Sequence, residues 1–273
     1  MEVAFRHEPT VRGAVGGDDG DCGSTLKKDD FSRGDQMNIF SIDIHGLDWF
    51  RLSVVATVLP KLMSAAGVTI YVALLAFAGA LVIGIPILVA RRSRLSLITR
   101  SSVFLADFIR STPLLLQIYF YFFVMPQIGI VLPPITTGIL ALSIHYGCYV
   151  AEAYRAGLEA LPTGQRDAVT ALGFSQVDAY RHVIVPQIIP FLVPTLGNLL
   201  VSIFKETPLL ASIAVTDIMF VAMQHGADYF QYIEPITLCG MIFLVISLAT
   251  SFFVRQLERL VSQVWLGRKT SHG

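Results

Sequence analysis

Residues 152–186 read EAYRAGLEALPTGQRDAVTALGFSQVDAYRHVIVP and lie between two apolar runs of an otherwise hydrophobic chain. A connection that only reverses the direction of the chain needs a few residues such as Gly, Asn or Pro. This stretch is much longer, is polar, and contains residues that favour short, capped helices. Its composition predicts an ordered segment on the water side of a membrane. Such a segment is most simply explained as a docking surface for another protein.

The composition of the 273-residue chain indicates an integral membrane protein. Hydrophobic residues make up 54% of the chain and charged residues only 15%, whereas charged residues make up about 25% of an average soluble domain. The formal net charge of zero carries no information about partners, and no nucleic-acid partner is expected. The three cysteines (Cys22, Cys148 and Cys239) are too widely spaced for a Cys-x-x-Cys site. We therefore expect neither a metal nor a cofactor.

Five apolar runs predict an all-α membrane fold, because only helices of this length satisfy the backbone within lipid. The first run, residues 67–90, has 24 residues without a charge and would extend about 36 Å, enough to cross a bilayer. The other runs are residues 103–124, 134–151, 188–204 and 233–254. We therefore expect five core transmembrane helices.

The two ends of the chain differ from this apolar middle. Residues 1–36 are rich in Gly, Asp, Lys and Arg and have no apolar periodicity, which predicts a disordered extension. Residues 37–66 mix apolar residues with charged ones such as Arg51 and Lys61, which predicts a helix lying along the membrane surface. Residues 261–273 are expected to form a cytoplasmic tail.

The distribution of Lys and Arg predicts the orientation, because cytoplasmic loops of membrane proteins are enriched in both. Arginines occur in residues 91–100, in residues 152–186 and in the C-terminal tail, whereas residues 125–134 and 206–232 contain neither Lys nor Arg. The C-terminus is therefore expected in the cytoplasm and the N-terminus outside. Basic residues of the N-terminal extension oppose this orientation, and we give them less weight because they lie far from the first span.

The polar stretch contains its own helix boundaries. The Pro-Thr-Gly triplet at 162–164 predicts the start of a short helix, and Gly173 predicts its end, since glycine commonly follows a helix in the left-handed conformation. Residues 175–178 have the spacing of a capping box, which predicts a second helix running to Pro186. Two capped helices around a glycine form a rigid unit rather than a loose loop.

This stretch resembles the cytoplasmic signature of the permease subunits of binding-protein-dependent ABC importers. That signature runs Glu-Ala-Ala, three residues, Gly, nine residues, Ile, any residue, Leu, Pro. Here the corresponding residues, at the same spacing, are Asp167, Ala168, Val169, then Gly173, then Val183, Ile184, Val185 and Pro186. The Asp and Val that replace Glu and Ala are conservative departures.

Further stretches are similar to the polar amino-acid branch of that family, the histidine, glutamine and arginine type. They are residues 108–115 (FIRSTPLL), 149–157 (YVAEAYRAG), 164–165 (GQ), 186–187 (PQ) and 205–209 (KETPL). The resemblance covers about residues 67–260, with a coupling-helix loop at about 155–186. It implies a type I ABC importer transmembrane domain of five core helices. The chain itself has no GxxxxGK[ST] phosphate loop and is therefore not the ATPase.

The resemblance implies a non-enzymatic subunit, with no catalytic residues, whose helix around residues 167–173 docks in a cleft of a cytoplasmic ATPase. The implied partners are an ABC ATPase dimer, a second permease (the same chain or a homologue) and a periplasmic solute-binding protein. The implied location is the bacterial inner membrane. The residues expected to couple to the ATPase are Gly164, Gln165, Asp167, Ala168, Val169, Gly173 and Pro186.

Polar residues in or beside the apolar runs are costly in lipid, which makes them candidates for a translocation path or its gate. The candidates are Arg110, Thr112, His145, Asn198, Lys205, Glu206 and Thr207. Asp107 and Arg110 can pair with each other, and Pro113 after Thr112 predicts a break in the second helix. Structural roles stay open beside the functional ones: an ion pair near the membrane interface, hydrogen-bonded packing for His145, and an interfacial stop at residues 205–206.

Together these features favour a permease that imports a polar amino acid, or a similarly small zwitterion, by alternating access. A compatible solute such as a betaine or ectoine is the nearest alternative. An integral membrane enzyme using His145 with Asp107 or Glu152 is disfavoured because no catalytic spacing joins these residues. A channel would need no ordered cytoplasmic segment. The identity of the solute, and whether two copies or one copy and a relative form the pore, stay open.

Overall fold

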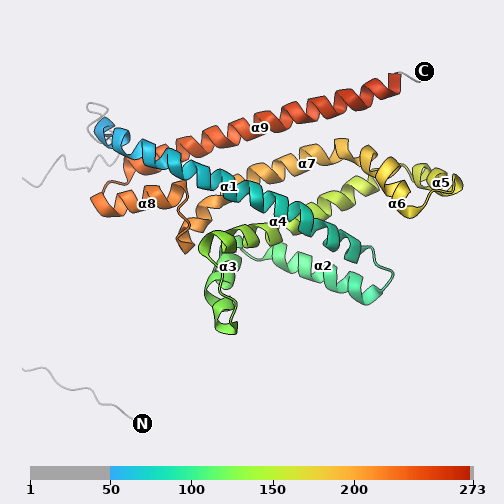
Figure 1. The fold of residues 1–273 in the computed structure, drawn as a ribbon, viewed down its shortest axis with the longest axis horizontal. Helices are drawn as coiled ribbons and strands as arrows, with labels where there is room; N and C mark the ends of the chain where they lie inside the picture. Colours follow the sequence, from blue (N-terminus) through green and yellow to red (C-terminus); the bar gives the residue numbers. More distant parts are fainter. Residues whose placement is uncertain (1–49, 271–273) are drawn as a thin grey trace, which may run out of the picture. The chain divides into compact units, whose positions relative to one another are not determined.

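A computed structural model describes residues 50–270, except for the side chains of Thr163, Arg166, Asp167, Thr170 and residues 264–270. All regular structure in this range is helical (Figure 1), so the predicted all-α fold is confirmed. The α-helices are α1 (Leu52–Arg91), α2 (Ser96–Ser111), α3 (Leu114–Tyr119), α4 (Pro134–Glu159), α5 (Thr163–Ala171), α6 (Gln176–Asp178), α7 (Val185–Glu206), α8 (Ile218–Tyr229) and α9 (Ile233–Thr270). The π-helical turns η2 (Phe120–Val124) and η4 (Ala179–Ile184) and the 3-10 turns η3 (Met125–Ile128) and η5 (Thr207–Ile213) link or extend them. The predicted extension 1–36 and residues 37–49 of the predicted surface helix lie outside the described residues.

Helix α1 is continuous from Leu52 to Arg91 and crosses residue 66, where the sequence predicts that a separate surface helix ends. Its 40 residues extend about 60 Å at 1.5 Å per residue, roughly twice the thickness of the lipid hydrocarbon core. Val58 and Leu62, in the N-terminal half, are fully buried in a cluster with residues of α8 and α9. Burial against protein therefore accounts for the mixed apolar and polar pattern of residues 52–66, which in the sequence alone predicts a helix on the membrane surface.

Three helical segments of the described chain are long and apolar enough to cross a membrane, residues 52–91, 176–213 and 233–263. They contain the first, fourth and fifth predicted apolar runs. A fourth candidate is α2 together with residues 114–128, which contains the second run and bends by 104°. The third run lies in α4, where 14 of 26 residues are buried. Because α4 faces protein more than lipid, small and polar side chains replace part of its apolar surface.

The bend between α2 and α3 lies at Thr112 and Pro113, as the sequence predicts. Proline has no N–H and disfavours helical backbone at the preceding residue, and Thr112 is accordingly extended, with ψ of 140°. The break leaves carbonyl groups at the end of α2 without helical partners. The Thr112 hydroxyl donates to the Ile109 carbonyl at 3.0 Å, and the Gln117 amide donates to the same carbonyl at 2.7 Å. Side chains thus replace the missing backbone bonds.

Helix α4 packs along α1 in the most extensive helix–helix contact of the described chain. Glycines permit this close approach: a Cβ added to Gly84 would lie 2.6 Å from Val150 Cγ1, and Gly147 is equally crowded by α1. Within the contact, the Ser143 hydroxyl donates to the Ala76 carbonyl at 3.1 Å. Helix α4 is therefore fixed against α1, which sets the position of both of its ends.

Helix α7 ends at Glu206, where the sequence predicts the end of the fourth span, and contains Pro190 and Pro194 within the helix. It packs against α9. The closest approach is at Gly197, where an added Cβ would lie 2.1 Å from Val254 Cγ1. A helix pair this close accepts no larger residue at that position without a shift of one helix.

We predict that Gly197→Ala destabilises the protein by about 1–3 kcal/mol, the usual cost of overpacking, because the new methyl group forces α7 and α9 apart. Gly240→Ala on α9 is the matched control, since a Cβ there meets no atom within 4 Å and alanine favours the helix. Thermal unfolding of the detergent-purified chain measures both. Equal unfolding temperatures for the two variants would contradict the packing described here.

Candidate functional site

The polar stretch of the sequence forms an ordered unit between α4 and α7. We call residues 160–184 the α4–α7 connection; it contains α5, α6 and η4 and lies at one end of the long helices (Figure 1). Gly173 has a φ of 70°, and the Phe174 N–H donates to the Val169 carbonyl at 3.3 Å across the turn. This bond from the third residue beyond α5, on the far side of the left-handed glycine, is the pattern of a glycine cap. The predicted end of α5 at Gly173 is confirmed.

The second short helix is also capped as predicted. The Ser175 hydroxyl oxygen accepts a hydrogen bond from the Asp178 N–H at 3.2 Å, and the hydroxyl donates to the Asp178 carboxylate at 2.6 Å. The first bond satisfies a backbone N–H at the start of the helix that would otherwise lack a partner, and the second fixes the Ser175 side chain. Two local caps, one on each side of Gly173, therefore hold the connection in one conformation.

Apolar contacts anchor the connection to both helices that it joins. Leu161 and Ile184 of the connection pack in one buried cluster with Leu158 of α4 and with Ile188 and Leu192 of α7. The side-chain amide of Gln187 on α7 donates from Nε2 to the side-chain oxygen Oε1 of Gln165 on α5 at 3.2 Å. A displacement of α5 is therefore transmitted to α4 and α7 rather than absorbed in a flexible loop.

The outer surface of the connection exposes large apolar side chains. Leu172 is 73% exposed, Val177 is 75% exposed and Phe174 is 44% exposed. Most other exposed apolar side chains lie on the long apolar helices, where lipid would cover them. Leu172 and Phe174 lie in the turn after the polar helix α5, and Val177 lies in the first turn of the helical segment 176–213, at the end next to α5. Apolar side chains exposed to water mark a binding surface. Phe174 and Val177 do not stand out in the sequence, because their exposure depends on how the connection folds.

A second group of polar residues meets beside the bend between α2 and α3. His145 of α4 is buried, and its Nδ1 lies 3.3 Å from Oε1, the side-chain amide oxygen of Gln117 on α3. The Gln117 amide nitrogen donates to the Thr112 hydroxyl at 2.7 Å. Gln117 thus links α4 to the break in the second span. Sequence reasoning does not identify Gln117, because one glutamine in an apolar run belongs to no recognisable motif.

Aromatic rings and two charged residues surround this hydrogen-bonded series. The rings of His145, Tyr146 and Tyr149 lie with centroids 5.4–6.0 Å apart. The guanidinium carbon of Arg110 lies 5.8 Å from the centre of the Tyr149 ring, and the half-buried Glu206 of α7 interacts with Tyr146. We call these residues, together with Thr112 and Gln117, the polar cluster. It presents a cation, a carboxyl group, an amide and phenol groups from α2, α3, α4 and α7.

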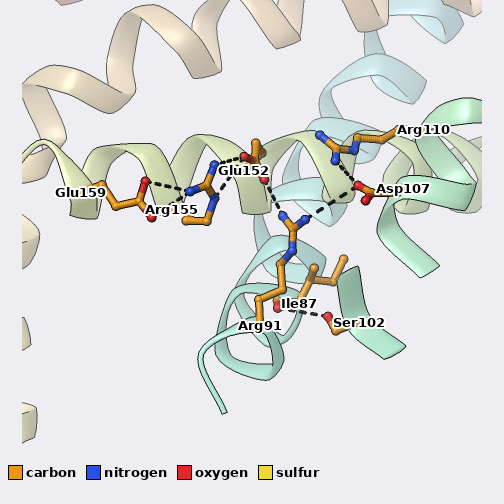
Figure 2. Close-up of polar contacts among 8 residues, drawn as sticks. All are labelled: Ile87, Arg91, Ser102, Asp107, Arg110, Glu152, Arg155 and Glu159. Carbon is orange, nitrogen blue, oxygen red and sulfur yellow. Dashed lines mark hydrogen bonds and ion pairs between the residues drawn. The ribbon is translucent and has the colours of Figure 1, made fainter. Parts of the chain in front are cut away.

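A series of six alternating charges links α2, α1 and α4 next to the α4–α7 connection (Figure 2). In order they are Arg110, Asp107, Arg91, Glu152, Arg155 and Glu159, and we call them the charge network. Arg91, the last residue of α1, is central: it donates to Glu152 of α4 and lies 3.8 Å from the Asp107 carboxylate of α2. Its side chain is only 9% exposed. The predicted pairing of Asp107 with Arg110 is confirmed, and the structure extends it across three helices.

Glu152 lies one residue beyond the third apolar run and has arginine partners on both sides. Hydrogen bonds from Arg155, with a smaller contribution from Arg91, hold the pKa of the Glu152 carboxyl below its usual range, because they favour the charged form. Arg155 also donates to both carboxylate oxygens of Glu159, at 2.8 and 2.7 Å. Glu152 is therefore ionised at neutral pH, when the network carries three positive and three negative charges.

One protein family accounts for most of the chain. The family described as "binding-protein-dependent transport system inner membrane component" matches residues 80–263. The chain belongs to this family. It is therefore a membrane component of a transport system and not an enzyme. Among the side chains that the structure describes, no group of three or more His, Cys, Asp or Glu is placed to hold a metal ion.

Individual relatives of this inner membrane component are amino-acid permeases. A probable amino-acid ABC transporter permease protein of Sinorhizobium fredii is 36% identical over 216 residues, 78% of this chain and 94% of the relative. The glutamine transport system permease protein GlnP of Escherichia coli is 30% identical over 214 residues, 78% of this chain and 96% of the relative. A chain of a solved amino acid ABC transporter with histidines superposes with a TM-score of 0.70 at 31% identity, covering 76% of this chain and 97% of that one. The fold is that of a type I importer.

The residues predicted to couple this permease to an ATPase do not share one environment. Four of them are exposed: Gly164, Gln165, Ala168 and Pro186. Gly173 forms the cap of α5. Val169 is buried, with 7% of its surface exposed, so it supports α5 from inside instead of facing a partner. Asp167 lies in α5, but its side chain is outside the described residues.

The residues predicted to line a path or gate also separate into groups. Members of the polar cluster are Arg110, Thr112, His145 and Glu206. Asn198 and Lys205 are exposed on α7. Thr207 is fully buried, and its hydroxyl donates to the Phe204 carbonyl at 2.9 Å. That bond satisfies the end of α7, which is a structural role for Thr207.

We predict that Gly173→Ala loosens the α4–α7 connection, because a side chain in the left-handed conformation costs about 1–2 kcal/mol. Gly164→Ala is the matched control, since a Cβ at Gly164 meets no atom within 4 Å. Hydrogen exchange of residues 160–184 in the detergent-purified permease should be faster in Gly173→Ala only. The same protection in both variants would mean that the glycine cap does not hold the connection.

Proposed function

We propose that this permease imports a polar amino acid, or a similarly small zwitterion, and that its α4–α7 connection docks to a cytoplasmic ATPase. The observation that carries the docking step is the exposure of Leu172, Phe174 and Val177 on a polar, rigid connection. The relatives, a glutamine permease among them, support the class of solute. The solute-binding protein outside and a second permease complete the proposed assembly.

The proposed orientation has the C-terminus and the α4–α7 connection in the cytoplasm and the N-terminus outside. Arginines concentrate after α1, in the connection and near the end of α9, in keeping with the cytoplasmic enrichment of Lys and Arg. In Figure 1 the C-terminal end of α1, the connection and the end of α9 lie toward the same side of the long helices. The charge distribution and the arrangement of the helices thus support the same orientation.

In the proposed docking step, α5 and the exposed apolar residues after it insert into a cleft of the ATPase. ATP-driven closure of two ATPase subunits then moves α5 of each permease as a rigid body. Because the connection is anchored to α4 and α7, that movement would tilt the helices that border the solute path. Rocking of rigid units between inward-open and outward-open states is a common form of alternating access.

The polar cluster is the proposed lining of the solute path. A zwitterion needs partners for a carboxylate and an ammonium group, and the cluster includes Arg110 and Glu206. Thr112 and Gln117 also border a largely apolar cavity of about 340 Å³ at the bend between α2 and α3. A broken helix at the membrane midplane is a recurring device for exposing backbone groups to a solute.

We predict that Val177→Asp disrupts association with the ATPase, because docking would bury an unpaired carboxylate. Phe230→Asp is the control: Phe230 is 89% exposed, and it follows α8 at the opposite end of the long helices (Figure 1). Affinity purification from native membranes should recover the ATP-binding subunit with wild type and Phe230→Asp, and recover several-fold less with Val177→Asp. Equal recovery with all three would contradict docking at the connection.

Uptake by membrane vesicles tests the class of solute. Labelled glutamine, histidine, arginine and glycine betaine are supplied with the binding protein, with and without the permease. We expect ATP-dependent uptake of at least one of the three amino acids, and its loss in Asp167→Ala and in Gly173→Val although both variants stay in the membrane. Uptake of betaine alone would identify a compatible-solute importer instead. Normal coupled transport in both variants would contradict the assignment of the α5 region.

A further inference from the structure

The charge network joins two places that must move together if the proposed function is correct. At one end, Glu159 is the last residue of α4, directly before the α4–α7 connection. At the other end, Arg110 lies in the last turn of α2, directly before the break at Thr112. Arg91 of α1 stands between them and contacts a carboxylate from each of the two helices. The network therefore spans the distance between the connection and the polar cluster.

Helix α2 is held less firmly than α4, which makes the ionic contact to it important. Helix α4 is locked to α1 by close glycine packing, whereas Ala106 is the one buried residue of α2 within the described chain. Near the network, the Ser102 hydroxyl lies 3.5 Å from the Ile87 carbonyl, at the limit of a hydrogen bond (Figure 2). Helices α1 and α2 can therefore move relative to each other more easily than α1 and α4 can.

The position of Arg91 suits a group shared between a fixed helix and a movable one. Its guanidinium donates to Glu152 on α4 and lies 3.8 Å from Asp107 on α2, so the contact to α4 is the tighter one. A guanidinium has a planar set of donors that can engage two carboxylates at once, which an ammonium group does less well. The Arg91 side chain is 9% exposed, whereas its partner Asp107 is 51% exposed and Glu152 is 31% exposed, so solvent and salt screen the contact to Asp107 more than the contact to Glu152.

We propose that Arg91 is a positioning residue that couples movement of the α4–α7 connection to the α2–α3 bend. The inference rests on the proposed docking of the connection to an ATPase. When α5 is pushed, α4 moves together with α1, to which it is locked, and Arg91 moves with both while it stays bonded to Glu152. The ionic contact between Arg91 and Asp107 then draws α2 along. The break at Thr112 and Pro113 is where this movement changes the geometry of the polar cluster.

The test compares ATP hydrolysis with solute uptake in the permease reconstituted with its ATPase and binding protein in liposomes. The probes are radiolabelled glutamine, histidine and arginine. In Arg91→Gln we expect uptake to fall about tenfold while ATP hydrolysis stays within about twofold of wild type, a magnitude typical of residues in coupling networks. A purely structural residue would lower both rates in proportion to the amount of intact complex. A wild-type ratio of hydrolysis to uptake, or a proportional fall of both rates, overturns the proposal.

Arg92 provides the matched control, because it follows Arg91 in sequence and its side chain is exposed. Arg92→Gln should keep the wild-type ratio. Arg91→Lys keeps the charge but loses the planar donors, and we expect an intermediate ratio. If Arg91→Gln does not assemble with the ATPase, Arg91→Lys is the variant that tests the proposal. A ratio of hydrolysis to uptake between those of wild type and an uncoupled complex supports the proposal, and a wild-type ratio overturns it.

A double-mutant cycle tests whether Arg91 acts through Glu152. Glu152→Gln and Arg91→Gln together should lose less coupling than the sum of the two single losses, because both single variants break the Arg91–Glu152 contact. Additive losses would mean that the two residues act separately and would overturn the proposal. Failure of the proposed function is distinguishable, since wild type would then show no ATPase association or no coupled uptake at all.

Discussion

Along α1 and α4, glycine residues bring two backbones so close that a single added methyl group would collide with the facing helix. The functional residues of α4 are positioned by this contact. The middle of α4 supplies His145, Tyr146 and Tyr149 to the polar cluster, and its end supplies Glu152, Arg155 and Glu159 to the charge network. Because small residues allow close packing where lipid offers no hydrophobic drive, α4 can be rich in polar groups and still be held firmly.

The polar cluster and the charge network each gather several polar side chains, and the cost of burying such groups explains why they lie together. Inside the bundle, His145, Gln117 and Thr112 form a hydrogen-bonded series beside the broken helix, whereas Arg110 Nε and Glu206 Oε2 of the same cluster are buried without a hydrogen-bond partner. At the proposed cytoplasmic end, alternating charges neutralise one another across three helices (Figure 2). A buried charge without a partner is strongly destabilising. A shift of either group therefore requires its partners to shift as well, which is what a coupled movement needs.

Features that depend on neighbours in sequence are those that could be predicted. Pro113 breaks a helix because of its own ring, Gly173 ends α5 because of its own backbone freedom, and Ser175 caps the residues that follow it. Asp107 and Arg110 pair because three positions separate them on one helix. Each of these predictions rests on chemistry within a few residues, and each is confirmed.

Features that depend on distant residues could not be predicted. The contact of Arg91 with Glu152 joins residues 61 positions apart, and that of Gln117 with His145 joins residues 28 positions apart. The boundary expected at residue 66 disappears because Val58 and Leu62 are covered by α8 and α9, and a half-polar helix packed on protein has the same pattern as one lying on lipid. The exposure of Phe174 and Val177 likewise depends on the folded connection.

Docking of the α4–α7 connection to an ATPase is the central claim, and crosslinking in native membranes tests it most directly. A photoreactive group attached at Val177→Cys would lie on the exposed side of the connection. The account predicts a crosslinked product containing an ATP-binding subunit, absent when the group is attached at Phe230→Cys. Crosslinks from position 177 that reach only lipid, or labelling of that position by a membrane-impermeant reagent added from outside, would contradict it.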